Sequence, residues 1–328
     1  MIITQAPLRI SFFGGGTDYP EYFENYGGGA VLAAAINKFA YVTASQFPSH
    51  LFDYSIRLSY RDVELTKNVA DIKHRVFRAC LELLGIAKDI ELHTVADLPS
   101  FTGLGSSSSF TVSLLKALHA YKGRFIKRLD LAYEAIYVER KMLNEAVGCQ
   151  DQTMAAVGGF NRVDFITEKE IVVKPVTISR ERLCELESHL VMVFTDIKRS
   201  AQKIASEQIK GIEDKVADYK VMYQMVEEAE NILYGNESLD AFGELLHSAW
   251  EYKQRLERSI SNDDINNMYQ KGLDSGAIGG KLLGAGGGGF LLFYIDPKNK
   301  QKLIDTFKGN HIIEPKLASP AAQVIYSS

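Results

Sequence analysis

The chain has 328 residues, of which 46% are hydrophobic and 24% are charged, a composition typical of a globular protein with about two domains. Its net charge of -4 argues against a general nucleic-acid binder or a protein that adheres to anionic membranes, because such proteins usually carry a basic excess. Binding of a small anion remains compatible with this charge, since local dipoles can hold one.

The cysteines and the apolar stretches indicate the cellular compartment. Cys80, Cys149 and Cys184 are widely spaced and form no CxxC or Cys/His metal pattern, which favours a reducing cytosol. The N-terminus lacks the basic and apolar regions of a signal peptide, and the longest apolar stretches, at 31–36 and 290–295, are far too short to span a bilayer. We therefore expect a cytoplasmic protein with neither a membrane nor a nucleic acid as partner.

The first half of the chain mixes strand and helix patterns. Alternating or continuous apolar runs predict strands, and apolar residues at helical spacing predict helices. Strands are predicted at Ile2–Phe13, Tyr41–Ser45, Ile56–Leu65, Ile90–Val95 and Ile171–Val176, and helices at Asp71–Leu84, Ser106–Tyr121 and Asp130–Val147.

The second half begins after a polar segment, Thr177–Ser188, with an apolar strand at His189–Thr195. We place a domain boundary there, which divides the chain into residues 1–176 and 177–328. Long helical stretches follow at Ile204–Tyr234, Leu239–Ser259 and Asp263–Ser275, and then a strand at Phe290–Ile295. Strands and helices without strict alternation favour an α+β fold over a doubly wound one.

Three glycine-rich loops are the most informative feature of the sequence. Glycine allows backbone N–H groups to approach an anion closely and adopts positive φ at little cost. Three such loops indicate a site assembled around phosphate from distant parts of the chain. They are Phe13-Gly14-Gly15-Gly16-Thr17-Asp18, Gly103-Leu104-Gly105-Ser106-Ser107-Ser108-Ser109 and Gly284-Ala285-Gly286-Gly287-Gly288-Gly289.

The middle loop gives the strongest signal. It opens the predicted helix at Ser106, where unpaired N–H groups and the helix dipole favour phosphate. A flexible linker with one N-capping serine is the alternative, but four serines in a row exceed what a cap needs. The loop has no Gly-Lys-Ser/Thr ending and no Gly-x-Ser-x-Gly elbow, so it is neither a Walker A loop nor a hydrolase nucleophile turn.

The third loop matches G-x-G-x-x-G at Gly284, Gly286 and Gly289. A dinucleotide-binding loop must follow a strand and open a helix. This loop leads into the predicted strand Phe290–Ile295 instead, so we reject the dinucleotide interpretation.

Glu139 is out of place on its predicted helix. At about 100° per residue it lies at the centre of an apolar stripe that includes Ile136 and Leu143. A carboxylate in that position is costly unless it is paired or binds a cation. Mg²⁺ beside a phosphate loop fits this position, and a buried salt bridge to an arginine or lysine is the alternative.

Two further carboxylates are candidates for chemistry. Asp151 follows Gly148, so a turn positions it where it could accept a proton from a substrate hydroxyl; the alternative is an N-cap for a short helix at 152–157. Arg9 and Asp18 flank the first glycine loop, where they either position a polyhydroxylated ligand or form a structural ion pair.

Taken together, these motifs resemble the GHMP kinase superfamily, which includes galactokinase, homoserine kinase and mevalonate kinase. The three matching segments run in the family's order over essentially the whole chain. They are Ala6-Pro7-Leu8-Arg9 with Gly14-Gly15-Gly16-Thr17-Asp18-Tyr19, Leu98–Ser108, and Lys281–Gly289. The resemblance implies an N-terminal ribosomal S5 domain 2-like domain, a C-terminal ferredoxin-like domain, and dependence on ATP and Mg²⁺.

The resemblance also implies roles for individual residues. Ser107 and Glu139 match the Mg²⁺ ligands, Asp151 the catalytic aspartate, and Arg9 the cation that steadies the transferring phosphoryl group. The segment implied to bind the ATP phosphates is Thr102, Gly103, Leu104, Gly105, Ser106, Ser107 and Ser108. The residues implied to contact the acceptor are Gly15, Gly16, Thr17, Asp18, Asp151, Gly286 and Gly287.

Two departures from the family pattern bear on the acceptor. Galactokinases have Gly-Glu-His-Thr-Asp-Tyr where this chain has Gly14–Tyr19, and Phe101 stands where a small residue is expected. The glycines leave room for a larger or phosphorylated sugar. This variant looks most like D-glycero-D-manno-heptose 7-phosphate kinases, which phosphorylate the anomeric C1 oxygen on the route to GDP-heptose for surface glycans.

Other functions and one further site stay open. A fucokinase- or galactokinase-like sugar 1-kinase is the alternative activity, and a catalytically inactive sugar and ATP sensor is the alternative class. Lys198 and Arg199 follow the strand His189–Thr195, where they could clamp the acceptor's phosphate, the arginine bidentately; a solvated pair on a loop is the alternative. The expected partners are a sugar phosphate and ATP, and the oligomeric state is undecided, with a homodimer as one option.

Overall fold

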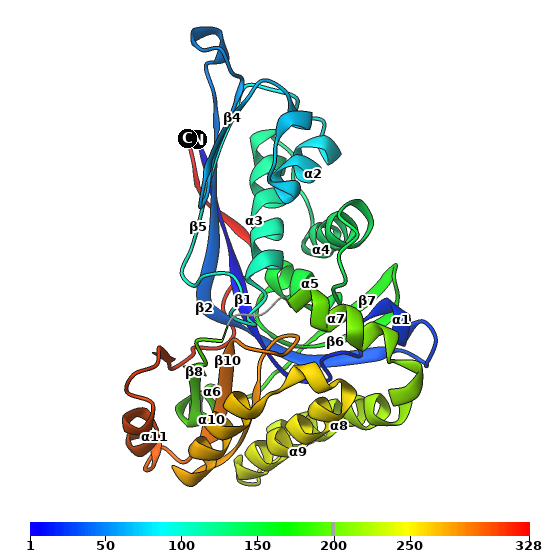
Figure 1. Cartoon of the computed structure of the whole chain (residues 1–328), viewed down its shortest axis with the longest axis vertical. Coiled ribbons are helices and arrows are strands. Elements are labelled where there is room, and N and C mark those ends of the chain that lie inside the picture. Colours follow the sequence, from blue (N-terminus) through cyan, green and yellow to red (C-terminus); the bar gives the residue numbers. More distant parts are fainter. Residues whose placement is uncertain (198–200) are drawn as a thin grey trace.

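The computed structural model describes residues 1–197 and 201–328, and within them helices pack against two β-sheets (Figure 1). Strands and helices do not alternate regularly, so the predicted α+β fold is confirmed. Among the helices described, none is both long and apolar enough to cross a membrane.

The larger sheet has eight strands within the described part of the chain. Its order is β12-β1-β2-β5-β3-β4, with β6 paired to β2 and β7 to β6. The long strand β2 pairs with β1 over most of its length, with β6 at its start and with β5 towards its end. The strands are β1 (Ile2–Phe13), β2 (Gly29–Gln46), β3 (Ile56–Ser59), β4 (Val63–Thr66), β5 (Ile90–Ala96), β6 (Phe160–Thr167), β7 (Glu170–Pro175) and β12 (Gln323–Ser327).

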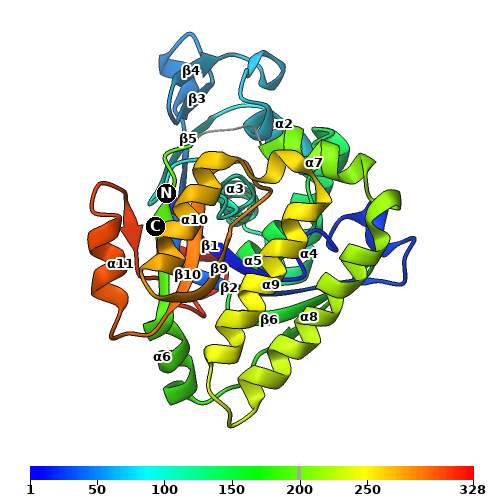
Figure 2. The same ribbon diagram turned by 60° about the horizontal axis from the view of Figure 1, so that its bottom comes forward.

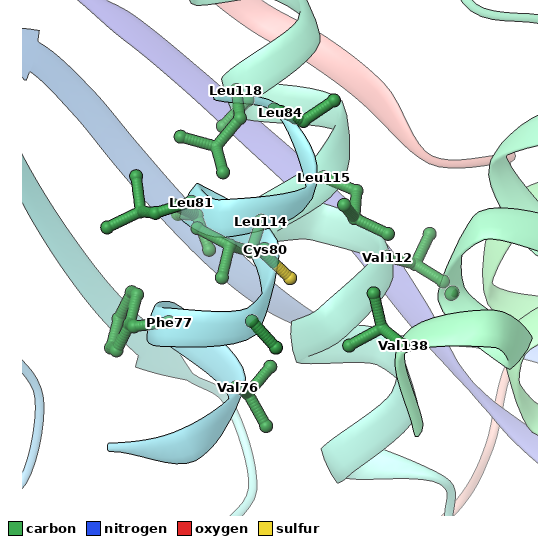
Figure 3. Packing of buried hydrophobic residues seen from close by; sticks show 14 of the residues in the cluster. Val76, Phe77, Cys80, Leu81, Leu84, Val112, Leu114, Leu115, Leu118 and Val138 are labelled. Atoms are coloured by element: carbon green, nitrogen blue, oxygen red, sulfur yellow. The ribbon is translucent and has the colours of Figure 1, made fainter. Parts of the chain in front are cut away.

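Helices from the first half of the chain cover one face of this sheet (Figure 1). They are α2 (Arg75–Leu83), α3 (Ser106–Tyr121), α4 (Arg128–Ile136) and α5 (Gln150–Val157). Leucines 114, 115 and 118 of α3 are fully buried and pack with Phe77 and Leu81 of α2 (Figure 3). This core fixes the direction of α3, whose N-terminus follows the middle glycine loop.

The smaller sheet is antiparallel in the order β11-β8-β10-β9, and helices from the second half of the chain surround it (Figure 2). Its central strand β10 is buried along its whole length, as its apolar sequence requires. The strands are β8 (Leu190–Phe194), β9 (Ala277–Leu282), β10 (Phe290–Ile295) and β11 (Ile312–Ile313). The helices are α6 (Arg180–His189), α7 (Ala201–Lys210), α8 (Val216–Tyr234), α9 (Asp240–Leu256), α10 (Asp263–Asp274) and α11 (Lys300–Thr306), while α1 (Pro20–Phe23) belongs to the first half.

The last strand of the chain returns to the first. In the antiparallel pair β1–β12, Ile2 lies opposite Ser327, and the two chain ends are neighbours in Figure 1. The larger sheet therefore contains residues from both predicted segments, 1–176 and 177–328. A domain boundary between residues 176 and 177 does not account for the pairing of β12 with β1, because this pair joins the two ends of the chain.

The helix predicted at Asp130–Val147 is wrong in its second half. Helix α4 continues as a π-helical turn over Tyr137–Met142 and then stops, and Asn144 is left-handed with φ 54°. The side chains of Arg75 and Arg140 donate to the carbonyls of Leu143 and Val147, so the backbone beyond the turn has partners without a helix.

Three smaller predictions also need correction. The strand predicted at Ile56–Leu65 is the hairpin β3–β4, and the helical stretch Ile204–Tyr234 is divided into α7 and α8. The polar segment Thr177–Ser188 contains α6, where the Ser179 side chain accepts a hydrogen bond from the Arg182 N–H as an N-cap. The charged face of this helix is exposed, which explains its weak apolar pattern.

The two sheets are joined where two glycine loops touch. A Cβ placed on Gly284, in the β9–β10 loop, would lie 2.6 Å from the Cα of Gly103, in the β5–α3 loop. The Phe290 N–H also donates to the carbonyl of Thr102, with 3.1 Å between N and O. Only glycine permits this approach, because both positions have positive φ and no room for a side chain.

We expect Gly284→Ala to destabilise the protein by more than its backbone strain alone. Left-handed φ costs an alanine about 1–2 kcal/mol, and overpacking against Gly103 adds about 1–3 kcal/mol. Gly85→Ala is the matched control, because Gly85 has φ 61° with no atom near its Cβ position. Urea unfolding of both variants measures the difference, and equal losses would contradict a tight loop contact.

Candidate active site

A cleft of about 400 Å³ lies where the three glycine loops converge. Its walls come from both sheets: Arg9 and Ser11 from β1, Lys281 from β9, and Lys253 and Leu256 from α9. The N-terminus of α3 and the start of α5 complete it. The cleft therefore brings together segments that are far apart in the sequence, such as those of Arg9 and Ala285, which are separated by 276 positions.

The middle loop presents the N-terminus of α3 to the cleft. Gly103 and Gly105 have φ of 77° and 75°, and Gly105 occupies the N-cap position with no side-chain cap. The first hydrogen bond to close the helix runs from Ser109 N–H to Gly105 O. The N–H groups of Ser106 to Ser108 precede it, so this end of a long helix can bind an anion.

Glu139 is almost completely buried, with 1% of its surface exposed. One carboxylate oxygen accepts hydrogen bonds from Ser108 Oγ at 2.9 Å and from Gln152 Nε2 at 2.5 Å, and the other has no hydrogen-bond partner in the part of the chain that the structure describes. Burial raises the pKa of Glu139 to about 7, although these hydrogen bonds favour its charged form. Within the described residues no arginine or lysine pairs with it, so the salt-bridge alternative is not what the structure has.

Arg9 pairs with Asp151. Its Nε and Nη2 atoms each donate to a different carboxylate oxygen at 2.7 Å, and its Nη1 atom donates to the Gly103 carbonyl at 2.7 Å. This bidentate geometry fixes both side chains beside the middle loop. From the sequence, Arg9 and Asp18 were expected either to position a ligand or to form an ion pair with each other. Neither expectation includes the pairing of Arg9 with Asp151.

Asp18 lies at the other end of the same cleft. It is buried and accepts hydrogen bonds from the N–H groups of Gly16 at 2.9 Å and Gln150 at 3.2 Å. Burial raises the pKa of Asp18, and the charge of Asp151 adds to that rise. A Cβ on Gly148 would lie 1.9 Å from an Asp18 oxygen, so glycine is required there.

Most of the site residues predicted from the sequence line this one cleft. The lining includes Arg9, Gly15, Gly16, Asp18, Thr102, Gly103, Gly105, Ser106, Ser107, Ser108, Glu139 and Asp151. Ser107, matched above to the metal ligand, is in the lining, but Ser108 is the serine that contacts Glu139. Phe101 also lines the cleft, exposed and with φ 72°.

Other predicted site residues face elsewhere. Thr17 donates to the Gly14 and Ala30 carbonyls and holds the first loop, and the Leu104 side chain is in the core. Gly286 and Gly287 approach Ile260, and from the third loop the lining has Gly284 and Ala285 instead. Lys198 and Arg199 lie outside the described residues.

Sequence analysis missed two buried lysines in the cleft wall. Lys253 and Lys281 are 7% and 3% exposed, and both line the cleft. A signal was present for Lys253, because it shares a helical face with the apolar residues Ala249, Trp250 and Leu256. Lys253 therefore carries the same mark as Glu139, a charged group on an apolar helical face.

The residues at the α3 end fit Mg²⁺ and a nucleotide phosphate. The unpartnered Glu139 oxygen and the serine hydroxyls are oxygen ligands of the kind Mg²⁺ prefers. No group of three or more His, Cys, Asp or Glu side chains suited to a metal occurs in the described part of the chain. A metal here would therefore take its remaining ligands from phosphate and water, which is typical of Mg²⁺ in phosphoryl-transfer sites.

Two models of known protein families match the chain, one in each half. Residues 67–159 match the GHMP kinases N-terminal domain and residues 225–311 match the GHMP kinases C-terminal domain. The chain therefore belongs to the GHMP kinase family, and it is a phosphotransferase with an alcohol group as acceptor.

The chain is also similar to individual sugar kinases over most of its length. The chain is 33% identical to a D-glycero-alpha-D-manno-heptose 7-phosphate kinase of Campylobacter jejuni, over 94% of this chain and 93% of the relative. It is 23% identical to a galactokinase of Thermotoga neapolitana over 87% of each. A crystal structure of a D-glycero-D-manno-heptose 1-phosphate kinase from Bacteroides thetaiotaomicron superposes with a TM-score of 0.74 at 25% identity, covering both chains completely.

The burial of Glu139 predicts a pH-dependent stability in the absence of Mg²⁺ and nucleotide. The folded pKa of about 7 exceeds the unfolded value of 4.5, so the folded state binds the proton more tightly. The free energy of unfolding should fall as pH rises from about 4.5 to about 7, by on the order of 2–3 kcal/mol.

Urea unfolding at pH 5 and pH 8 measures this component. Glu139→Gln should remove it and should be more stable than the wild type at pH 8, because the amide needs no proton. Glu82→Gln changes an exposed carboxylate on α2 in the same way and is the matched control. An unchanged pH dependence in Glu139→Gln would contradict the assignment.

Proposed function

We propose that this GHMP kinase transfers the γ-phosphoryl group of ATP to the anomeric hydroxyl of a sugar phosphate, D-glycero-D-manno-heptose 7-phosphate, and forms the 1,7-bisphosphate. The observation that carries the proposal is the bidentate Arg9–Asp151 pair, held at the Gly103 carbonyl beside the N-terminus of α3. The similarity over nearly the whole length of the Campylobacter jejuni heptose 7-phosphate kinase supports the choice of acceptor.

At the α3 end, the middle loop would bind the ATP phosphates. The N–H groups of Ser106 to Ser108 and the helix dipole favour the negative charge, and Glu139 with the hydroxyls of Ser107 or Ser108 would hold Mg²⁺. When bound, Mg²⁺ supplies positive charge that offsets the charge on the β- and γ-phosphates.

Asp151 would act on the acceptor hydroxyl. One of its oxygens takes the hydroxyl proton as the acceptor oxygen bonds to phosphorus and ADP departs. Arg9 orients this carboxylate with two hydrogen bonds, and its own positive charge lies close to the developing negative charge. The two side chains therefore provide mainly position and electrostatic stabilisation.

The first glycine loop would form the acceptor's pocket. Gly15 and Gly16 leave the cleft wall there without side chains, and Asp18 with Gln150 supplies polar groups for sugar hydroxyls. A larger acceptor than galactose suits this space. The alternative class, an inactive sensor, conflicts with a complete set of Arg9, Glu139 and Asp151 in one cleft.

We expect heptose 7-phosphate to be the best acceptor in a coupled assay of ADP formation, with strict dependence on Mg²⁺. The comparison set is mannose, fucose, galactose and mevalonate, each at several concentrations. A higher kcat/KM for fucose or galactose would replace the heptose by one of the alternative sugars. Sugar binding without ADP formation from any acceptor would support the sensor instead.

Asp151→Asn should lower kcat by about 10²- to 10⁴-fold, because the amide cannot accept the hydroxyl proton. ATP binding, followed by equilibrium titration, should change little, since the α3 N-terminus is untouched. The control is Gln202→Ala, a change in the cleft wall without a base. An Asp151→Asn enzyme with near-wild-type kcat would exclude Asp151 as the base.

A further inference from the structure

Lys253 and Lys281 form a pair of buried ammonium groups without a carboxylate partner among the described residues. Lys253 Nζ donates to the Leu282 carbonyl at 2.9 Å and to the Gly284 carbonyl at 2.5 Å. Lys281 Nζ donates to the Phe12 carbonyl at 2.6 Å. An ammonium group has three donors, so donors remain on both lysines.

The position of the pair connects it to the reacting groups. Lys253 binds the carbonyl of Gly284, and Gly284 touches Gly103, whose own carbonyl accepts from Arg9. The charge of Arg9 also acts on both lysines. Because Asp151 already pairs with Arg9, no carboxylate among the described residues forms an ion pair with either lysine.

Uncompensated buried charge is costly, and two lysines together are more costly than one. Burial lowers the pKa of Lys281 to about 7, and burial followed by the charge of Lys281 lowers the pKa of Lys253. Backbone carbonyls alone do not neutralise these groups. A bound dianion would, and a phosphate group has both the charge and the acceptor oxygens for it.

We propose that Lys253 and Lys281 form a seat for one phosphate group beside the Arg9–Asp151 pair. This inference rests on the proposed function for the identity of the phosphate: it is either the phosphate that the acceptor sugar already carries or the phosphoryl group in transfer. It assigns phosphate recognition to α9 and β9 in the described chain, whereas sequence analysis looked for it only at Lys198 and Arg199.

Binding of inorganic phosphate tests the seat without reference to any sugar. Phosphate should protect the wild-type protein in thermal unfolding, and Lys253→Met and Lys281→Met should each raise the apparent Kd by about 10- to 100-fold. Methionine keeps much of the apolar stem and removes the charge. Unchanged phosphate affinity in both variants, or no phosphate binding by the wild type, would overturn the proposal.

Lys122→Met is the matched control. Lys122 also donates to a backbone carbonyl, that of Leu84, but it lies just beyond the C-terminus of α3 and away from the cleft. It should lose stability as the other variants do and keep its affinity for phosphate. Loss of phosphate affinity in this control as well would mean that stability alone explains the effect, against the proposal.

A measurement on the wild-type chain covers variants that do not fold. Acetylation of Lys253 and Lys281 by acetic anhydride, followed by mass spectrometry of peptides, should slow when phosphate is present, while acetylation of exposed Lys88 should not. Equal rates with and without phosphate at both buried lysines would again overturn the proposal.

Kinetics with two kinds of acceptor distinguish the sources of the phosphate. If the seat takes the acceptor's own phosphate, Lys253→Met raises KM for heptose 7-phosphate by about 10- to 100-fold and changes kinetics little for unphosphorylated sugars. If it takes the phosphoryl group in transfer, kcat falls by a similar factor with every acceptor. If no sugar is phosphorylated, the proposed function is wrong. The binding of inorganic phosphate still tests the role of the two lysines in that case.

Discussion

The backbone contact between Gly103 and Gly284 is the constraint on which the site depends. It brings the loop before α3 against the loop after β9, and the neighbouring carbonyls then become anchors for cations. Gly103 O accepts from Arg9, and Gly284 O accepts from Lys253. A side chain at either glycine would separate the two loops. The positions of Arg9 and Lys253 therefore depend on the absence of a Cβ atom at Gly103 and at Gly284.

The charged side chains of the cleft neutralise one another only in part. Arg9 neutralises Asp151, but Glu139 at the α3 end has no cation and the lysines have no anion among the described residues. Under the two proposals above, Mg²⁺ would balance the charge of Glu139, and a phosphate group would balance the charge of the lysines. The cleft therefore favours a cation at the Glu139 end and an anion at the lysines, because each uncompensated buried charge is costly.

Where local sequence decides the structure, the prediction was accurate. Helix α3 begins at Ser106 and ends at Tyr121, and strands β1 and β10 have the predicted bounds, because their apolar patterns are long and their ends are marked by glycine or polar residues. Glu139 stood out for a similar reason, since a charge interrupts an apolar stripe. The π-helical turn after α4 carries no such mark, so the helix was predicted too long.

Contacts between distant segments could not be derived in this way. The Arg9–Asp151 pair joins β1 to α5 across 142 residues, whereas the only ion pair suggested for Arg9 by the sequence was with Asp18. The return of β12 to β1 depends on the whole fold as well. The family resemblance supplied roles for Arg9 and Asp151, but their direct hydrogen bonds came only from the structure.

The irregular segment after α4 determines where Asp151 lies relative to Glu139. Leu143 N–H donates to Val138 O, five residues earlier, and Glu145 N–H donates to Glu139 O, so the helix widens and closes directly behind the buried carboxylate. The chain then reaches Gly148, where Asp18 packs, and restarts as α5 with Asp151 in its first turn. A regular helix through Val147 would carry these residues away from Asp18 at 1.5 Å per residue. The π-helical turn therefore lets one short stretch of chain hold both the proposed metal ligand, Glu139, and the proposed base, Asp151.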